Sequence, residues 1–233
     1  MKPSSKLCKI LFILFSITLN YACTTITNIV DIKDSGSVNF TSLQASIPLQ
    51  PETNDSQIKM ILSQTSRENF EQLIDPFAYI TINDITFPGG TLLNGSYEFE
   101  MRAFAYGHEY QESNAIIGTF FGIANVSLDL ELSSINNSTT VKDKITNPYL
   151  EIYTKHYSTP KSYTLLSLAG VVSLNTESKR ALEINAGIGY KLIKNMELLG
   201  GIKIWKYISP GEYNTSGIVL NTSGPFISLN FSF

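Results

Sequence analysis

Alternation of apolar and polar residues is the main pattern from residue 75 to the C-terminus. Residues 126–133 (VSLDLELS) place valine and leucine at every second position, with serine, aspartate and glutamate between them. Residues 97–102 (YEFEMR) and 181–192 (ALEINAGIGYKL) repeat this pattern. A period of two residues is typical of a β-strand with two different faces, and none of these stretches has the 3.6-residue period of a helix. The pattern therefore predicts an all-β domain.

Eight strands can be placed in residues 75–233, because segments rich in Gly, Pro, Asn, Asp or Ser separate the alternating stretches. The predicted strands are residues 77–87, 97–102, 119–133, 149–156, 163–174, 181–192, 196–208 and 218–233. Short turns at 110–114, 157–162 and 193–196 alternate with longer connections, of which 134–146 is the longest. This alternation predicts an eight-stranded antiparallel up-and-down transmembrane β-barrel.

Residues 23–74 are richer in Ser, Thr, Asn and Gln, and Pro48 and Pro51 interrupt any long element. Phe40 and Leu43 indicate a short strand, and the spacing of apolar residues in 57–73 indicates a short amphipathic helix. We expect this segment to be a polar periplasmic extension, with the barrel in residues 75–233.

The N-terminus carries an export signal. Three lysines precede an apolar run at 10–19 (ILFILFSITL), which is too short for a membrane-spanning helix, so residues 1–22 are predicted to be a secretory signal peptide. The end of this run, residues 19–23 (LNYAC), resembles a bacterial lipobox, although Asn20 stands where that motif has leucine. The resemblance implies a lipoprotein that begins at a lipidated Cys23. The alternative is ordinary cleavage that leaves Cys23 as a free thiol.

The last ten residues (GPFISLNFSF) place Ile227, Leu229, Phe231 and Phe233 on one face and end in phenylalanine. This segment resembles the C-terminal strand of Gram-negative outer-membrane β-barrel proteins. The resemblance implies that these four residues form an assembly signal for the barrel assembly machinery, and that the protein lies in the cell outer membrane among its lipids. The alternative is a soluble barrel whose edge strand ends in phenylalanine.

The barrel interpretation assigns each row of side chains to a face. Apolar rows, including Leu130, are expected to contact lipid, and polar rows are expected to form a salt-bridged core, since eight strands leave room only for side chains. Expected in the aromatic girdle are Tyr97, Phe99, Tyr190, Phe231 and Phe233. Expected inside are Glu98, Glu100, Arg102, Asp129, Glu131, Glu151, Lys155, Glu183, Lys191 and Lys203, with Tyr79, Tyr153, Trp205 and Tyr207 among them or at the rims.

Composition excludes several classes of function. The 17 Lys and Arg against 20 Asp and Glu give a formal charge of -3, which argues against a nucleic-acid partner. Two cysteines, Cys8 and Cys23, and two histidines, His108 and His156, are too few for a disulfide framework or a zinc cluster. We therefore expect no metal and no cofactor.

One short motif raises the question of catalysis. His156 and Ser158 resemble the His-x-Ser pair of outer-membrane lipid A deacylases, but Thr159 replaces the asparagine of that motif and residues 163–174 carry no glutamate. We therefore expect no catalytic residues and a non-enzymatic outer-membrane barrel that serves envelope integrity or surface interaction. Two alternatives stay open: a barrel enzyme of the lipid A deacylase type, and a soluble periplasmic lipocalin-like lipoprotein that binds an apolar ligand.

Overall fold

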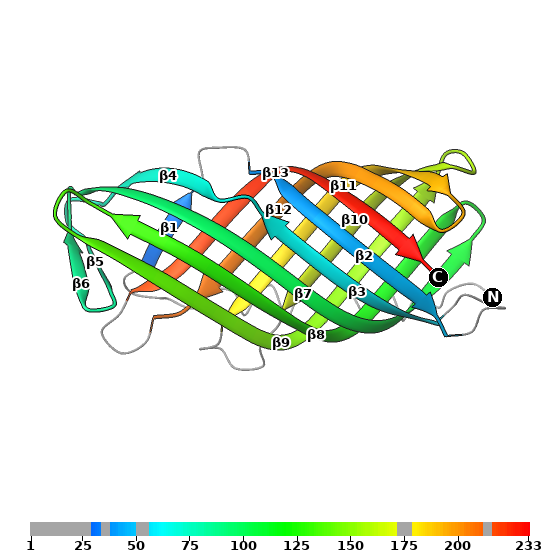
Figure 1. Cartoon of the computed structure of the whole chain (residues 1–233), viewed down its shortest axis with the longest axis horizontal. Coiled ribbons are helices and arrows are strands. Elements are labelled where there is room, and N and C mark those ends of the chain that lie inside the picture. Colours follow the sequence, from blue (N-terminus) through cyan, green and yellow to red (C-terminus); the bar gives the residue numbers. More distant parts are fainter. Residues whose placement is uncertain (1–28, 34–37, 50–55, 172–178, 212–215) are drawn as a thin grey trace.

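The computed structural model describes residues 29–33, 38–49, 56–171, 179–211 and 216–233. The predicted signal peptide and Cys23 lie outside these ranges, and within them all regular secondary structure is β (Figure 1). The strands are β1 (Ile29–Lys33), β2 (Phe40–Pro48), β3 (Ser56–Thr65), β4 (Glu68–Leu73), β5 (Tyr79–Ile82), β6 (Ile85–Pro88), β7 (Leu92–Glu112), β8 (Ala115–Ser133), β9 (Ser138–Tyr157), β10 (Ser162–Val171), β11 (Arg180–Ile193), β12 (Met196–Ser209) and β13 (Gly217–Ser232). No described residue belongs to a helix that could cross a membrane.

Nine strands close into a barrel in the order β2, β3, β7, β8, β9, β10, β11, β12 and β13, with β13 pairing back to β2. β13 pairs with β1 along its first part and with β2 along its last part, and β7 pairs in the same way with β4 and then β3. β1 and β4 therefore extend the positions of β2 and β3 and add no further strand to the ring. The β13–β2 seam is parallel, from Phe226 opposite Phe40 to Ser232 opposite Ser46. An odd number of strands requires one such pair, because the other neighbours alternate in direction.

The prediction of eight strands is wrong for two reasons. β2 and β3 belong to the barrel although they lie in the segment expected to be an extension, and residues 77–87 do not join the barrel sheet. The helix predicted at 57–73 is also wrong, because β3 and β4 pair with β7 there. The inward row of β3 mixes Lys59 and Ser63 with Ile61, and this mixture hides the two-residue period in the sequence.

Residues 79–88 form a separate hairpin, β5–β6, that folds over one end of the barrel (Figure 1). Its two-residue turn consists of Asn83 and Asp84, whose positive φ angles of 48° and 63° suit a tight hairpin. The hairpin is held down by Thr81, whose amide donates to Ser216 Oγ at 3.0 Å. Its own side chains Ile80, Ile82 and Phe87 are buried as part of the hydrophobic core. We call this end of the molecule the capped end.

The opposite end, which we call the turn end, carries the C-terminus and the connections at 113–114, 158–161 and 194–195 (Figure 1). The short turns predicted at these three places are confirmed. The long loop predicted at 134–146 is wrong, because β9 begins at Ser138 and only residues 134–137 connect it to β8. The strands therefore continue where the polar composition suggested a loop.

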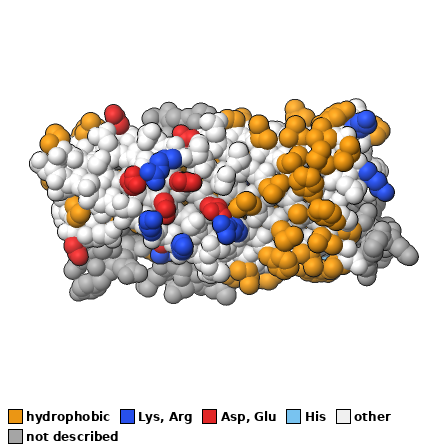
Figure 2. Space-filling model, viewed as in Figure 1, with side chains coloured by type: hydrophobic (Ala, Val, Ile, Leu, Met, Phe, Trp, Pro, Cys, Tyr) orange, Lys and Arg blue, Asp and Glu red, His pale blue; other side chains and the backbone are white. Residues whose placement is uncertain are grey.

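The outward row of side chains changes character along each long strand. On β8 the exposed outward residues near the turn end are Ile117, Phe121 and Ile123, whereas Asp129 and Glu131 follow toward the capped end. On β7 the outward row changes in the same way, from Phe104 and Tyr106 to Arg102, Glu100 and Glu98. Hydrophobic side chains accordingly form a band toward the turn end, and charged ones gather on the capped half (Figure 2).

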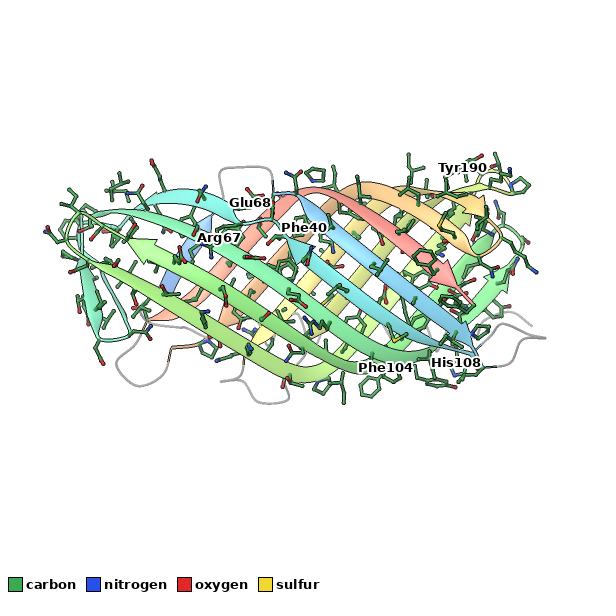
Figure 3. All side chains as sticks on the ribbon, viewed as in Figure 1. Phe40, Arg67, Glu68, Phe104, His108 and Tyr190 are labelled. Atoms are coloured by element: carbon green, nitrogen blue, oxygen red, sulfur yellow. The ribbon has the colours of Figure 1, made fainter. Side chains whose placement is uncertain are left out.

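We call the band the belt. Its exposed members are Leu43, Ile47, Met60, Leu62, Phe104, Tyr106, Tyr110, Ile117, Phe121, Ile123, Leu150, Leu166, Ile188, Tyr190, Leu192, Leu198, Ile202, Ile204, Ile227 and Phe233. Phe104 and Tyr190 project away from the barrel wall in Figure 3, whereas Phe40 lies within it. Outside the belt, the capped half carries surface ion pairs such as Arg67 with Glu131, at 3.2 Å.

The predicted facing of the rows is confirmed in one half of the barrel and wrong in the other. Ile188 and Ile227 point outward with exposed fractions of 68% and 62%, and Glu183 points inward, as predicted. Leu130, Tyr97 and Phe99 are buried instead of facing outward. In the capped half the apolar row faces the lumen, as it does in a soluble barrel. Strands with apolar residues inward and strands with apolar residues outward have the same two-residue period, so the sequence pattern does not distinguish them.

Candidate binding chamber

Aromatic residues pack across the lumen of the capped half. The rings of Phe99 and Trp205 stack with centroids 4.0 Å apart, and Tyr207 stacks on Trp205 at 5.7 Å. Phe40 meets Phe99 edge-on at 6.1 Å, and Leu130 is buried among the core residues. Trp205, Tyr207 and Tyr153 are therefore interior residues as predicted, whereas Tyr79 lies exposed on the cap.

The turn half encloses a polar chamber with a volume of about 320 Å³. Strands from β2 around to β13 contribute to its wall, and the rim includes residues of the turn end such as Pro48, Asn195 and Ser232. The charged residues that line it are Lys59, Glu109, Glu151, Lys155, Glu183, Lys191, Lys194, Glu197 and Lys203.

In the described part of the chain, three ion pairs join charged residues that line the chamber. Lys59 lies 2.8 Å from Glu151, and Lys203 lies 2.9 Å from Glu183. Lys155 lies 3.0 Å from Glu197, which also accepts a hydrogen bond from a tyrosine of β10. Such pairing offsets the cost of removing each charge from water.

The prediction of a salt-bridged interior is confirmed for Glu151, Lys155, Glu183 and Lys203, and Lys191 also lines the chamber. It is wrong for Glu98, Glu100, Arg102, Asp129 and Glu131, which lie on the outer surface of the capped half. Sequence reasoning missed Lys59 and Glu197. The two-residue period of β12 puts Glu197 on the same face as Lys203, so the sequence could have identified Glu197 as an interior residue. Lys59 could not be identified in this way, because the sequence indicates a helix for the segment that contains it.

Aromatic rings support the cations of the chamber. Lys59 Nζ lies 4.8 Å from the centroid of Tyr153, and Lys191 Nζ lies 4.6 Å from the centroid of Tyr157. The negative face of an aromatic ring attracts a cation in this arrangement. Tyr153 also donates its hydroxyl to Glu109, which accepts a second bond from Gln57 at 2.8 Å.

Asn185 lines the chamber and has an acceptor that no described residue bonds. Its Nδ2 donates to Ser167 Oγ at 2.8 Å and to Glu183 Oε1 at 2.7 Å. Because a carboxylate can only accept, this bond fixes the orientation of the amide. Asn185 Oδ1 is buried and has no hydrogen-bond partner in the described part of the chain.

Two lysines at the chamber mouth add positive charge. Lys191 is half-buried and Lys194 is exposed at the β11–β12 turn. Among the described residues, neither lies within 4.0 Å of a carboxylate oxygen in an ion pair. The mouth therefore holds two cations beyond those that the wall carboxylates bind directly.

A second buried charge cluster lies in the capped half, outside the belt. Asp143 accepts hydrogen bonds from Tyr207, at 2.8 Å, and from Lys179. Burial alone would raise the pKa of Asp143, but the hydrogen bonds from Lys179, Ser209 and Tyr207 outweigh it and lower this pKa. Burial, reinforced by the Asp143 charge, raises the pKa of the Tyr207 hydroxyl. The cluster is a structural tie between β9, β12 and the residue that precedes β11.

The two residues that resemble the deacylase motif have different hydrogen-bond partners. His156 Nε2 lies 3.2 Å from Asn114 Nδ2, whereas Ser158 bonds to Ser162. A different chain of side chains forms around His108, which lies on the outer face at the turn end (Figure 3). His108 Nδ1 lies 3.1 Å from Ser56 Oγ, and His108 Nε2 lies 2.9 Å from Tyr106 OH. Ser56 and His108 are opposite each other across β3 and β7, so only the strand register brings them together.

The C-terminal residues form the last part of the closing seam. Ile227 and Phe233 are exposed, and Leu229 and Phe231 are half-buried. Phe233 N donates to Ser46 O at 3.0 Å, and Ser232 N donates to Asn195 O at 3.0 Å. These bonds hold the chain end against β2 and the β11–β12 turn.

The fold defines the class of this protein as a closed, nine-stranded all-β barrel. Comparison with models of protein families, with curated proteins and with solved structures finds no match. Within the described residues, no three His, Cys, Asp or Glu side chains are grouped so that they could hold a metal ion.

Proposed function

We propose that this chain is a non-enzymatic outer-membrane β-barrel protein, with the belt in the bilayer and the capped half outside it. The observation that carries the proposal is the common height at which neighbouring outward rows change. Phe104 is opposite Ile123 in the register of β7 and β8, and Arg102 is opposite Asn125. A change from apolar to polar at one level on adjacent strands is what a membrane surface would select.

The height of the belt supports this proposal. The belt extends over residues 104–110 on β7, where His108 stands among the outward Phe104, Tyr106 and Tyr110, and over 182–192 on β11. At about 3.3 Å per residue and a tilt of about 40°, seven to eleven residues span roughly 18 to 28 Å, against about 25 Å for the apolar band of a membrane barrel. Tyr110, Tyr190 and Phe233 are exposed near its turn-end edge, where aromatic residues favour the interface.

Exposure of the belt to water argues against a soluble barrel. The belt has twenty exposed large apolar side chains, with at least one from every strand of the ring, whereas soluble monomers rarely expose apolar patches of more than a few hundred Å². The packed core and the β5–β6 cap occupy the lumen of the capped half, so the proposed role is surface contact or envelope integrity and not free diffusion through a pore. In this proposal the turn end faces the periplasm, and the capped half projects from the cell.

The test is membrane fractionation combined with gel migration of unboiled and boiled samples in SDS. We expect the full chain in the outer-membrane fraction, with a mobility shift on boiling, because a detergent-resistant barrel migrates differently from its unfolded chain. Recovery of folded protein in the soluble periplasmic fraction would overturn the proposal.

One observation favours a second candidate, an enzyme that cleaves lipid esters at the belt surface. Ser56, His108 and Tyr106 follow the order of nucleophile, base and orienting group, at 3.1 and 2.9 Å. A phenol is a weaker orienting group than a carboxylate, so non-enzymatic function ranks first. Release of fatty acid from phospholipid vesicles by the wild type, lost in Ser56→Ala and retained in Ser158→Ala, would promote the enzyme.

A further inference from the structure

We propose that the chamber binds a small anionic sugar, such as a sugar phosphate or sugar acid, with its charge at the mouth and its hydroxyl groups against the inner wall. The inference does not depend on membrane insertion. It concerns the lumen of the turn half, to which the proposed surface role assigns no function.

The inner wall of the chamber suits a ligand group that donates a hydrogen bond. Asn185 is nine-tenths buried and lines the chamber, and its Oδ1 has no hydrogen-bond partner among the described residues, because Glu183 and Ser167 hold its Nδ2. A buried acceptor without a partner is costly, and a hydroxyl group inside the chamber would satisfy it. Ser228 and Asn230, which also line the chamber, bond to each other at 2.8 Å and offer further hydroxyl and amide groups nearby.

The mouth of the chamber suits an anionic ligand group. Wall lysines 59, 155 and 203 have carboxylate partners at 2.8 to 3.0 Å, whereas Lys191 and Lys194 have no ion pair among the described residues. Glu109, the remaining carboxylate of the wall, is bonded to Gln57 and Tyr153. An anionic group between Lys191 and Lys194 would therefore gain charge-assisted hydrogen bonds without displacing an existing pair.

Size and surface chemistry narrow the ligand to one sugar unit. A volume of about 320 Å³ is at the small end of ligand pockets, which typically measure about 300 to 1,000 Å³. The lining is mainly Lys, Glu, Asn, Gln and Ser, which does not suit an acyl chain. Tyr157 and Phe226 add apolar ring surface, against which the carbon face of a sugar ring can pack while its hydroxyl groups meet the polar groups.

The test is calorimetric titration of the purified, folded full chain with glucose 6-phosphate and with glucuronate. Glucose and inorganic phosphate serve as separate probes of the two halves of the ligand. We expect glucose 6-phosphate or glucuronate to bind at least tenfold more tightly than glucose and than phosphate. A ligand with a dissociation constant of about 1 mM would be detected at about 10 mM. If neither anionic sugar binds at that concentration, the proposal is overturned.

Variants locate the site. The double variant Lys191→Gln/Lys194→Gln should weaken binding of the anionic sugar at least tenfold. Lys161→Gln is the matched control, because Lys161 lies on the neighbouring turn but does not line the chamber, and it should leave affinity unchanged. Equal weakening by both changes would indicate non-specific attraction to the turn end and would overturn the proposed site.

Asn185→Ala tests the inner wall. It should weaken binding of glucose 6-phosphate about fivefold to tenfold and leave the affinity for inorganic phosphate unchanged, because phosphate alone needs only the mouth. Circular dichroism and thermal unfolding check that each variant is folded, whether or not the protein is a membrane barrel. A folded Asn185→Ala protein that binds glucose 6-phosphate as the wild type does would contradict the assigned ligand orientation.

Discussion

At the scale of single residues, Asp143 links the pH of the solution to the stability of the capped half. Its folded-state pKa is lowered, so the charged form contributes stability at any pH above the ordinary value near 3.8, and this contribution is lost as the pH falls through the folded pKa. Asp143→Asn should lower the free energy of unfolding at pH 7 by about 1.5 to 3 kcal/mol, the typical value of hydrogen bonds to a charged group.

The measurement is urea unfolding at several pH values between 7 and 3. Wild type should lose stability below about pH 4, and Asp143→Asn should show a flatter profile there. Asp129→Asn is the control, since Asp129 pairs with Lys142 on the surface at 3.7 Å and such pairs contribute little. Parallel pH profiles for wild type and Asp143→Asn would contradict the assigned role.

Phe121 and Leu130 lie on the same strand but on opposite faces, and this difference is testable with one type of substitution. Phe121 is the middle one of the three belt residues of β8, so Phe121→Arg places a charge near the midplane of the proposed membrane band and should cost about 2 to 4 kcal/mol in a bilayer. Leu130→Arg places a charge in the packed core and should prevent folding in detergent and in lipid alike, because Leu130 is fully buried.

Ser127→Arg is the control in this series and should have little effect on stability, since Ser127 points outward in the capped half. The measurement is the unfolding free energy in lipid vesicles and the folded yield in detergent micelles. If Leu130→Arg folds as well as Ser127→Arg, the inward facing of Leu130 is wrong.

At the scale of elements, the parallel seam between β13 and the N-terminal strand depends on a glycine. A Cβ atom at Gly224 would lie 1.9 Å from the carbonyl oxygen of Val38, whose amide bonds to Ser223 O at 3.2 Å. Gly224→Ala should therefore force these segments apart and destabilise the barrel by about 1 to 3 kcal/mol, the usual cost of overpacking.

Gly200→Ala provides the matched control on neighbouring β12, because a Cβ there would meet its nearest atom at an ordinary 3.7 Å. Thermal unfolding followed by the loss of gel mobility shift would compare the two variants. Equal melting temperatures would mean that the seam is looser than the backbone contacts indicate.

The C-terminal strand is predicted to act as an assembly signal, separately from its contribution to stability. Phe233 is 72% exposed, so its deletion removes little buried surface and should cost well under the roughly 2 kcal/mol of a fully buried phenylalanine. Deletion should nevertheless reduce accumulation in the cell severalfold, while the purified variant still refolds in detergent. Normal accumulation would contradict the proposed signal formed by Ile227, Leu229, Phe231 and Phe233.

At the scale of the whole molecule, the odd strand count determines where the chain enters the barrel. β2 runs parallel to β13, so it begins toward the capped end, whereas β13 finishes at the turn end. β1 also runs parallel to β13, with Ile29 opposite Gly217, so β1 likewise begins toward the capped end. The start of the first described strand is therefore on the side of the capped half, the proposed outer surface.

Metabolic labelling with a fatty-acid analogue should mark the wild type and spare Cys23→Ser. Protease added to intact cells should then release the labelled N-terminus if the capped half faces outward. An unlabelled wild type with a free N-terminus near Cys23 would leave ordinary signal cleavage as the explanation. Label that intact cells protect from protease would reverse the proposed orientation.

The sequence by itself determined the class of secondary structure and the position of most turns. The alternation at 126–133 and 181–192 requires strands, since a polar residue at every second position cannot follow a helical face. The turn residues at 113–114 and 194–195 likewise fix two hairpins, because the flanking alternation leaves no other place for the chain to reverse. Local preference and local pattern are sufficient for these features.

Only the tertiary structure decided which row faces the lumen, how many strands close the ring and which polar groups meet. Leu130 and Ile188 belong to rows with the same sequence pattern, yet one is buried and the other is exposed, because facing depends on the ring as a whole. Lys59 and Glu151, 92 residues apart, pair only because the ring closes. Asn185 Oδ1, which has no partner within the described ranges and on which the proposed sugar site depends, is likewise a consequence of closure and is not encoded in any local motif.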